Sequence, residues 1–117
     1  MLRAAVFAAL LILVPHVSSA GDALTDAKIK DLITGNTVEG SMIATGAYSE
    51  FYAVDGTIKG KGYSGKWTVK DNAMCFQYGT DPISCFEIVK DDDKVLWVQD
   101  GKTLGDGTIT GGNTNKY

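Results

Sequence analysis

The chain has 117 residues, 44% of them hydrophobic, and a formal net charge of −3. Its only arginine, Arg3, and its only histidine, His16, both lie in the first twenty residues, so the remainder carries ten lysines against fourteen acidic residues, a net charge of −4. Such a surface repels phosphate backbones and lacks the planar forks that grip phosphate. The composition therefore argues against nucleic-acid binding and gives no support to adhesion on an anionic membrane.

Residues 1–20 have the three parts of a secretory signal. Arg3 supplies the positive charge, residues 4–14 form an apolar run, and Ser18-Ser19-Ala20 is a small-residue cleavage site. An apolar run of about a dozen residues is too short to cross a bilayer core, which needs about twenty. We expect cleavage after Ala20, a periplasmic or secreted protein, and no membrane span in the mature chain. Residues 21–117 are then one domain with a modest core.

Residues 21–36 are expected to hold one short helix within "LTDAKIKDLITGN". Thr25 can cap its first turn, and Gly35 can end it in a left-handed conformation. A helix this short persists only when it docks on other elements. The residues that can dock form a narrow apolar stripe of Leu24, Ile29, Leu32 and Ile33.

Residues 37–110 read as a succession of short strands, near 37–43, 48–54, 57–63, 66–70, 73–78, 83–89, 94–99 and 103–110. Tight hairpin turns are indicated at Asp55-Gly56, Asp71-Asn72, Asp92-Asp93 and Asp100-Gly101. The pattern predicts a mainly β fold, an antiparallel up-and-down meander of about eight strands. Both a small barrel and a sandwich bury alternate residues, so both architectures stay open. The polar tail, residues 111–117, is expected to be flexible.

The two cysteines, Cys75 and Cys85, flank a segment with turn chemistry, "GTDP". A four-residue loop would put their thiols on opposite faces of a hairpin, whereas an odd loop centred on Thr80 sets them directly opposite, within disulfide distance. The spacing is not that of a redox motif, and two thiols without histidine are too few for a structural zinc site. We predict a Cys75–Cys85 disulfide and a five-residue loop or a bulge.

Alternation along the strands predicts which side chains face the interior. Met74, Phe76 and Tyr78 share one face, which Phe86 and Ile88 continue across the hairpin, and this leaves the disulfide on the other face. The segment "VLWVQ", residues 95–99, is apolar on both faces. Its outer side is therefore expected to be covered, with the helix as the candidate cover.

Catalytic chemistry finds little support in the sequence. The mature chain has no histidine to activate a serine, and "GYSGK" around Ser64 matches no nucleophile motif. The acidic run at residues 91–93 lacks the spaced ligands of a calcium loop and reads as a solvated hairpin tip. Glu50 and Glu87 stand among aromatic residues, where burial could raise a pKa, but such glutamates more often face solvent. We expect no enzyme activity, no catalytic residue, no metal and no cofactor.

The aromatic residues are the best candidates for a binding role. Aromatic side chains at the mouth of a barrel make suitable walls for a small apolar ligand. A small β domain also uses such residues simply as its core. The candidate ligand-binding residues are Tyr48, Tyr52, Tyr63, Trp67 and Trp97.

The order of several short motifs resembles that of a family of small exported alphaproteobacterial proteins classed as a domain of unknown function. The motifs are "DLITGNTVEG", "FYAVDGTIKGKGYSGKW", "MCFQYG" and "CFEIV". This resemblance implies a periplasmic or secreted home and carries no known activity or catalytic residue. Gly65-x-Trp67 is also similar to the Gly-x-Trp of lipocalins, and the chain is similar in a looser way to small barrel inhibitors of bacterial proteases.

Together these observations favour an exported, non-enzymatic β-domain that binds a small apolar or aromatic ligand. The alternative is a protein-interaction or protease-inhibitor-like module that acts through its loops or an edge strand. An exposed apolar patch would favour the alternative.

Overall fold

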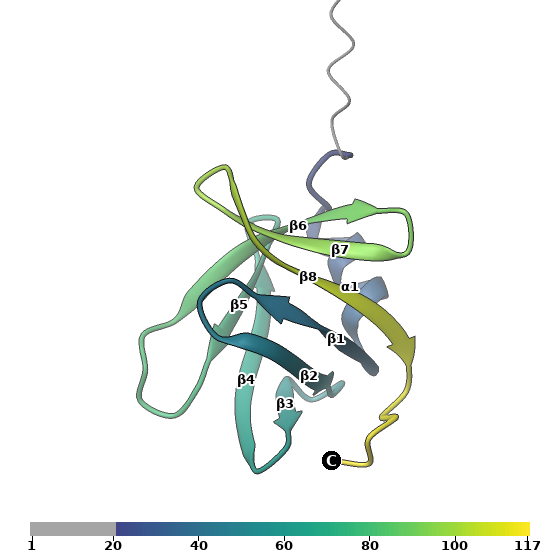
Figure 1. The fold of residues 1–117 in the computed structure, drawn as a ribbon, viewed down its shortest axis with the longest axis vertical. Coiled ribbons are helices and arrows are strands. Elements are labelled where there is room, and N and C mark those ends of the chain that lie inside the picture. Colours follow the sequence, from purple (N-terminus) through teal and green to yellow (C-terminus); the bar gives the residue numbers. More distant parts are fainter. Residues whose placement is uncertain (1–20) are drawn as a thin grey trace, which may run out of the picture.

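The computed structural model describes residues 21–117, which form one helix and eight strands closed into a barrel (Figure 1). The predicted signal segment, residues 1–20, lies outside the described residues. The elements are α1 (Asp26–Ile33), β1 (Asn36–Met42), β2 (Gly46–Tyr52), β3 (Thr57–Gly60), β4 (Tyr63–Lys70), β5 (Ala73–Gln77), β6 (Ser84–Asp91), β7 (Lys94–Gln99) and β8 (Lys102–Gly111).

Every strand pairs antiparallel with its neighbours in sequence, and β1 also pairs with β8. Val38 shows the closure, since it lies opposite Glu50 of β2 on one side and Ile109 of β8 on the other. The predicted up-and-down meander is confirmed, and the architecture is a barrel, not a sandwich. Closure gives every strand of residues 36–111 a neighbour on both sides, although β2 pairs with β3 only at Phe51 and Tyr52.

The predicted turns occur where the sequence placed them, but several strand boundaries were wrong. The expected strand 57–63 ends at Gly60, and β4 begins at Tyr63, not at residue 66. Lys61 and Gly62 form the turn between them, and Gly62 has a φ of 79°, a conformation that favours glycine. β2 also begins and ends two residues earlier than expected, at Gly46 and Tyr52.

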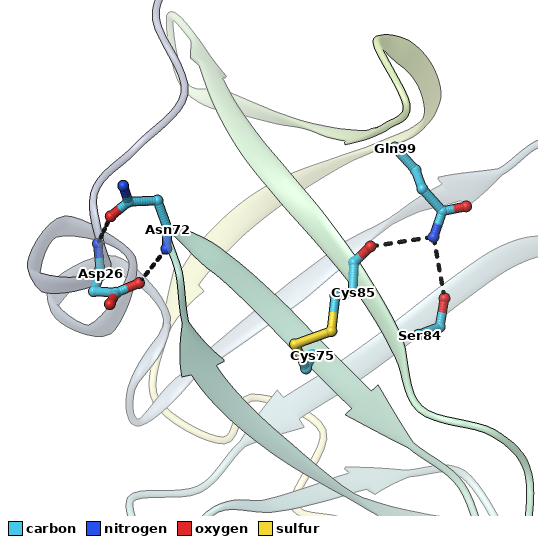
Figure 2. The surroundings of a disulfide bond; sticks show 6 residues. All are labelled: Asp26, Asn72, Cys75, Ser84, Cys85 and Gln99. Carbon is cyan, nitrogen blue, oxygen red and sulfur yellow. Dashed lines mark hydrogen bonds between the residues drawn. A yellow bond between two sulfur atoms is a disulfide. The ribbon is translucent and has the colours of Figure 1, made fainter.

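Helix α1 runs across the end of the barrel at which β1 begins. Its fully buried side chains, Ile29 and Ile33, belong to the core. Thr25 stands at the N-cap but makes no side-chain cap hydrogen bond, contrary to expectation. Instead, the backbone N–H of Asp26 donates to Asn72 Oδ1 at 3.1 Å, and the N–H of Asn72 donates to Asp26 Oδ1 at 2.6 Å (Figure 2). The helix is therefore tied to the β4–β5 turn.

The other end of the helix is held at the end of β2, where the N–H of Gly35 donates to the carbonyl oxygen of Tyr52 at 2.7 Å. The helix packs against β1, β4 and β5, so the expectation that it covers β7 was wrong. The physical reason is the connection to β1, residues 34–35, which is too short to carry the helix around to β7.

The predicted disulfide joins Cys75 of β5 to Cys85 of β6, and the two residues are directly opposite in the ladder (Figure 2). The register therefore agrees with a loop centred on Thr80. The connection spans residues 78–83 and is longer than expected. Pro82 has no N–H to donate, and Ile83 after it stays exposed outside the ladder.

The core fills the barrel from the α1 end. Met74 and Phe76 face inward with Ile88, as alternation predicted, and the disulfide lies on the other face of the sheet. The tail folds back over β1 and β2: Thr37 Oγ1 donates to the Gly112 carbonyl at 2.6 Å, and Asn115 Nδ2 donates to Ser49 Oγ at 2.6 Å. Its flexibility stays a prediction. In residues 21–117 no helical segment has both the length and the hydropathy needed to span a bilayer.

Candidate functional site

A cavity of about 730 Å³ opens at the barrel end opposite α1. Residues of the β1–β2, β3–β4 and β5–β6 hairpins line it, and all of these hairpins turn at that same end. Its volume falls within the range of small-molecule sites. The aromatic part of the lining consists of Tyr48, Tyr52, Tyr63, Phe76, Tyr78, Phe86 and Trp97.

Four of the five predicted ligand-binding residues line this cavity: Tyr48, Tyr52, Tyr63 and Trp97. Trp67 does not belong to the lining. It is 8% exposed, packs edge to face against Tyr52 with ring centroids 6.2 Å apart, and donates from Nε1 to the Ala53 carbonyl at 3.0 Å. Trp67 is therefore part of the hydrophobic core next to the cavity.

Glu50 is the most unusual residue of the site. It lies between Tyr48 and Tyr52 on the inner face of β2, two residues from each, and is only 6% exposed. Tyr52 donates its hydroxyl proton to Oε1 at 2.9 Å, and Tyr63 donates to Oε2 at 2.7 Å. Tyr78 lies within 2.9 Å of Oε1 and 3.0 Å of Oε2. We call Glu50, Tyr52, Tyr63 and Tyr78 the tyrosine–glutamate cluster.

Two glycines make room for this cluster. Tyr63 lies opposite Gly60 across the β3–β4 hairpin, and a Cβ on Gly60 would lie 2.2 Å from the Tyr63 ring. A Cβ on Gly65 would lie 2.8 Å from the Tyr78 ring. Neither ring could take its present position over a larger residue, so the absence of a side chain at both glycines lets the tyrosines reach Glu50.

Tyr48 and Trp97 form a second polar contact in the cavity wall. Trp97 Nε1 donates to the Tyr48 hydroxyl oxygen at 2.7 Å, and that hydroxyl donates to the Asp106 carbonyl at 2.7 Å. Tyr48 therefore extends from β2 past β1 to β8. Phe76 and Phe86 pack edge to face against Trp97, with ring centroids 5.4 and 6.4 Å away. These contacts fix the aromatic wall of the cavity.

The tyrosines of the cluster hold their protons firmly. Burial, together with the charge of Glu50, raises the pKa of Tyr52 and Tyr78 well above the ordinary value for tyrosine. Burial and the hydrogen bond to Glu50 raise the pKa of Tyr63. Burial also raises the pKa of Tyr48. All four are therefore neutral hydrogen-bond donors at physiological pH, not tyrosinate nucleophiles or bases.

The expectation that glutamates in these strands face solvent was right for Glu87, which is exposed, and wrong for Glu50. The pattern Tyr48-x-Glu50-x-Tyr52 held the signal, because residues two apart on a strand share a face. Tyr78 and the phenylalanines were assigned to the inner face but not to the site. The acidic hairpin tip at residues 91–93 is exposed, as expected.

The chemistry open to the site follows from its donors and acceptors. Glu50 accepts from three hydroxyls, so both of its oxygens are engaged. Within residues 21–117, no three His, Cys, Asp or Glu side chains gather in a group that could hold a metal ion. Every buried side-chain nitrogen or oxygen of the described chain has a hydrogen-bond partner. The cavity thus joins an aromatic wall to one satisfied carboxylate.

Compared with protein-family models, with curated proteins and with solved structures, the chain matches none of them. The resemblance to a family of small exported proteins therefore stays a prediction.

Proposed function

We propose that the protein is an exported, non-enzymatic binding module that holds a small apolar or aromatic ligand inside its barrel. The observation that carries the proposal is the cavity of about 730 Å³, walled by aromatic side chains and open at one end. Rigid aromatic walls bury apolar surface at little entropic cost, which is what a carrier of small molecules needs.

Two further features support this role. The Cys75–Cys85 disulfide suits an oxidising compartment outside the cytoplasm, in keeping with the predicted signal peptide. In the cavity, the tyrosines keep their protons and Glu50 is engaged by them, so these groups serve binding better than proton transfer.

The test uses N-phenyl-1-naphthylamine, a neutral aromatic probe whose fluorescence increases in apolar surroundings. We expect saturable binding to the protein. Ser84 lies at the cavity wall, and Ser84→Trp should fill the opening and weaken binding at least tenfold. Thr68→Trp adds the same ring on the exposed outer face of β4 and should leave the affinity unchanged. Absence of saturable binding, or equal loss in both variants, contradicts the proposal.

A native mass spectrum of protein recovered from its own exported fraction tests the rest. A chain that begins at Gly21 and lacks two hydrogens agrees with signal cleavage and the disulfide. An added small-molecule mass that disappears on denaturation identifies the natural ligand. A chain that retains residues 1–20 contradicts the predicted cleavage.

A second candidate is a protein-interaction or protease-inhibitor-like module. Ile43 and Ile83 favour it, since they are 79% and 58% exposed on two loops at the cavity end. The loops are its means of contact, because barrel closure removes the edge strand that the other version requires. Inhibition of a panel of secreted proteases by the protein, lost in Ile43→Ser/Ile83→Ser, would support this candidate. No inhibition of any of them would count against it.

A further inference from the structure

The tyrosine–glutamate cluster determines what kind of ligand the cavity can accept. Glu50 lines the cavity together with its three tyrosine partners, so its carboxylate belongs to the binding surface and not only to the core. Tyr63 is 44% exposed, which makes the cluster reachable from the cavity mouth. A ligand in the cavity therefore meets these oxygen atoms directly.

The protons of the cluster are already committed. Each tyrosine hydroxyl has one proton, and Tyr52, Tyr63 and Tyr78 all donate theirs to Glu50. Tyr48 donates its proton to the Asp106 carbonyl. The deep hydroxyl and carboxylate oxygens of the cavity thus present lone pairs to a ligand, whereas the hydroxyls of Thr45, Ser64 and Ser84 in the lining can turn to donate. A ligand polar group at the cluster must bring its own protons.

The charge of the cluster is also uncompensated. All hydrogen-bond partners of Glu50 in the described chain are neutral hydroxyls, and the Glu50 charge acts on the tyrosines around it. A buried charge without a cation beside it attracts one strongly, because water no longer screens it. Phe76, Phe86 and Trp97 add aromatic rings to the lining, and ring faces attract cations as well.

We propose that the cavity selects small hydrophobic amines, with the protonated nitrogen at Glu50 and the tyrosine oxygens and the apolar part against Phe76, Phe86 and Trp97. The inference rests on the proposed ligand-binding function and deepens it. A carboxylic acid of the same shape is rejected, since its charge faces that of Glu50 and it finds no free donor in the cluster.

The test compares three ligands with one ring system: 1-naphthylmethylamine, 1-naphthylmethanol and 1-naphthoate, titrated calorimetrically into the protein with its disulfide intact. We expect the amine to bind at least tenfold more tightly than the alcohol, and the acid to bind most weakly. An amine that binds no better than the alcohol, or an acid that equals it, overturns the amine selectivity while the binding function stands. If none of the three binds and the neutral probe fails as well, both proposals are overturned.

Two variants locate the effect. Glu50→Gln removes the charge at nearly constant shape and should lower amine affinity at least tenfold while alcohol affinity changes less than twofold. Tyr63→Phe, at the exposed rim, removes one donor but keeps the charge, and it should retain the preference for the amine. An amine preference that survives Glu50→Gln overturns the inference. If Glu50→Gln fails to fold, the three-ligand comparison on the unaltered protein and on Tyr63→Phe decides whether the cavity selects amines.

Discussion

At the scale of single residues, the site depends on the absence of a side chain at Gly65. A Cβ there would lie 2.8 Å from the Tyr78 ring and 2.9 Å from the Gln77 carbonyl oxygen, and the latter belongs to the backbone and cannot turn away. We expect Gly65→Ala to displace Tyr78 from Glu50 and to lower the free energy of unfolding by about 1–3 kcal/mol. Urea denaturation followed by tryptophan fluorescence measures this change.

Gly111→Ala is the matched control for that substitution. Gly111 also lies in a strand, and the nearest atom to a Cβ there is Asn36 Oδ1 at 4.0 Å. Its unfolding free energy should change by less than about 0.5 kcal/mol. Equal effects of Gly65→Ala and Gly111→Ala would show that the Tyr78 ring does not need the space over Gly65.

The buried hydroxyl of Tyr52 supports a second prediction at this scale. Tyr52 is 1% exposed and donates to Oε1 of Glu50 at 2.9 Å. Tyr52→Phe keeps the ring but removes a hydrogen bond to a charged group, which is worth about 1.5–3 kcal/mol. We expect a loss of unfolding free energy in that range, read from urea denaturation. Tyr63→Phe should cost less, because solvent can replace its hydroxyl; the reverse order would contradict this account.

The position of Glu50 was within reach of sequence reasoning and yet was predicted wrongly. Tyr48 and Tyr52 were both predicted to line the site. Glu50 is two residues from each of them, so strand alternation puts it on the same face. A general preference of glutamate for solvent outweighed that pattern. The preference failed because Tyr63 and Tyr78 arrive from β4 and from the loop after β5 to satisfy the carboxylate, and no local pattern reveals such long-range partners.

At the scale of elements, the β5–β6 hairpin depends on its disulfide. In the loop-entropy model, closing the ring from Cys75 to Cys85 contributes about 3 kcal/mol. We expect Cys75→Ala/Cys85→Ala to lower the unfolding free energy by about that amount, measured by urea denaturation. Reduction of the unaltered protein should produce a similar loss. A change below about 1 kcal/mol in both would show that the hairpin holds its register without the bond.

Helix α1 shows what a local sequence pattern can and cannot predict. The apolar stripe predicted which residues dock, and Ile29 and Ile33 are fully buried. The predicted side-chain cap by Thr25 was wrong. Asp26 and Asn72, which are distant in sequence, exchange hydrogen bonds and hold the start of the helix instead. The prediction that the helix covers β7 was also wrong. It was based on the apolar residues on both faces of β7, whereas the short link to β1 determines where the helix lies.

At the scale of the whole molecule, the strand number followed from turn signals, but closure did not. Whether β1 meets β8 depends on pairing between residues such as Val38 and Ile109, which are separated by most of the chain. Alternating burial is the same in a sandwich and in a barrel, so the sequence left both open. Closure in turn creates the cavity, because it brings β2, β4, β6 and β7 around one interior.

The tyrosines of this interior make the stability of the whole molecule depend on alkaline pH. The pKa values of Tyr48, Tyr52, Tyr63 and Tyr78 are all raised in the folded protein, first of all by burial. Below the unfolded value of about 10, both states keep their protons and the full stability is present. As the pH rises above about 10, the unfolded chain releases protons that the folded chain retains, so the unfolding free energy falls.

Tyrosinate absorbance distinguishes the ionisation of the tyrosines from the deprotonation of the lysines, because lysine side chains do not absorb at the wavelength where tyrosinate does. In concentrated urea, the tyrosines should ionise near pH 10, whereas at about pH 11 the native protein should keep most of them protonated. Urea midpoints should fall over the same interval, and less steeply in Tyr52→Phe, which has one fewer buried hydroxyl to ionise. Native tyrosines that titrate with the unfolded ones would mean that water enters the barrel freely, and then the cavity could not protect a charge on Glu50 from the solvent.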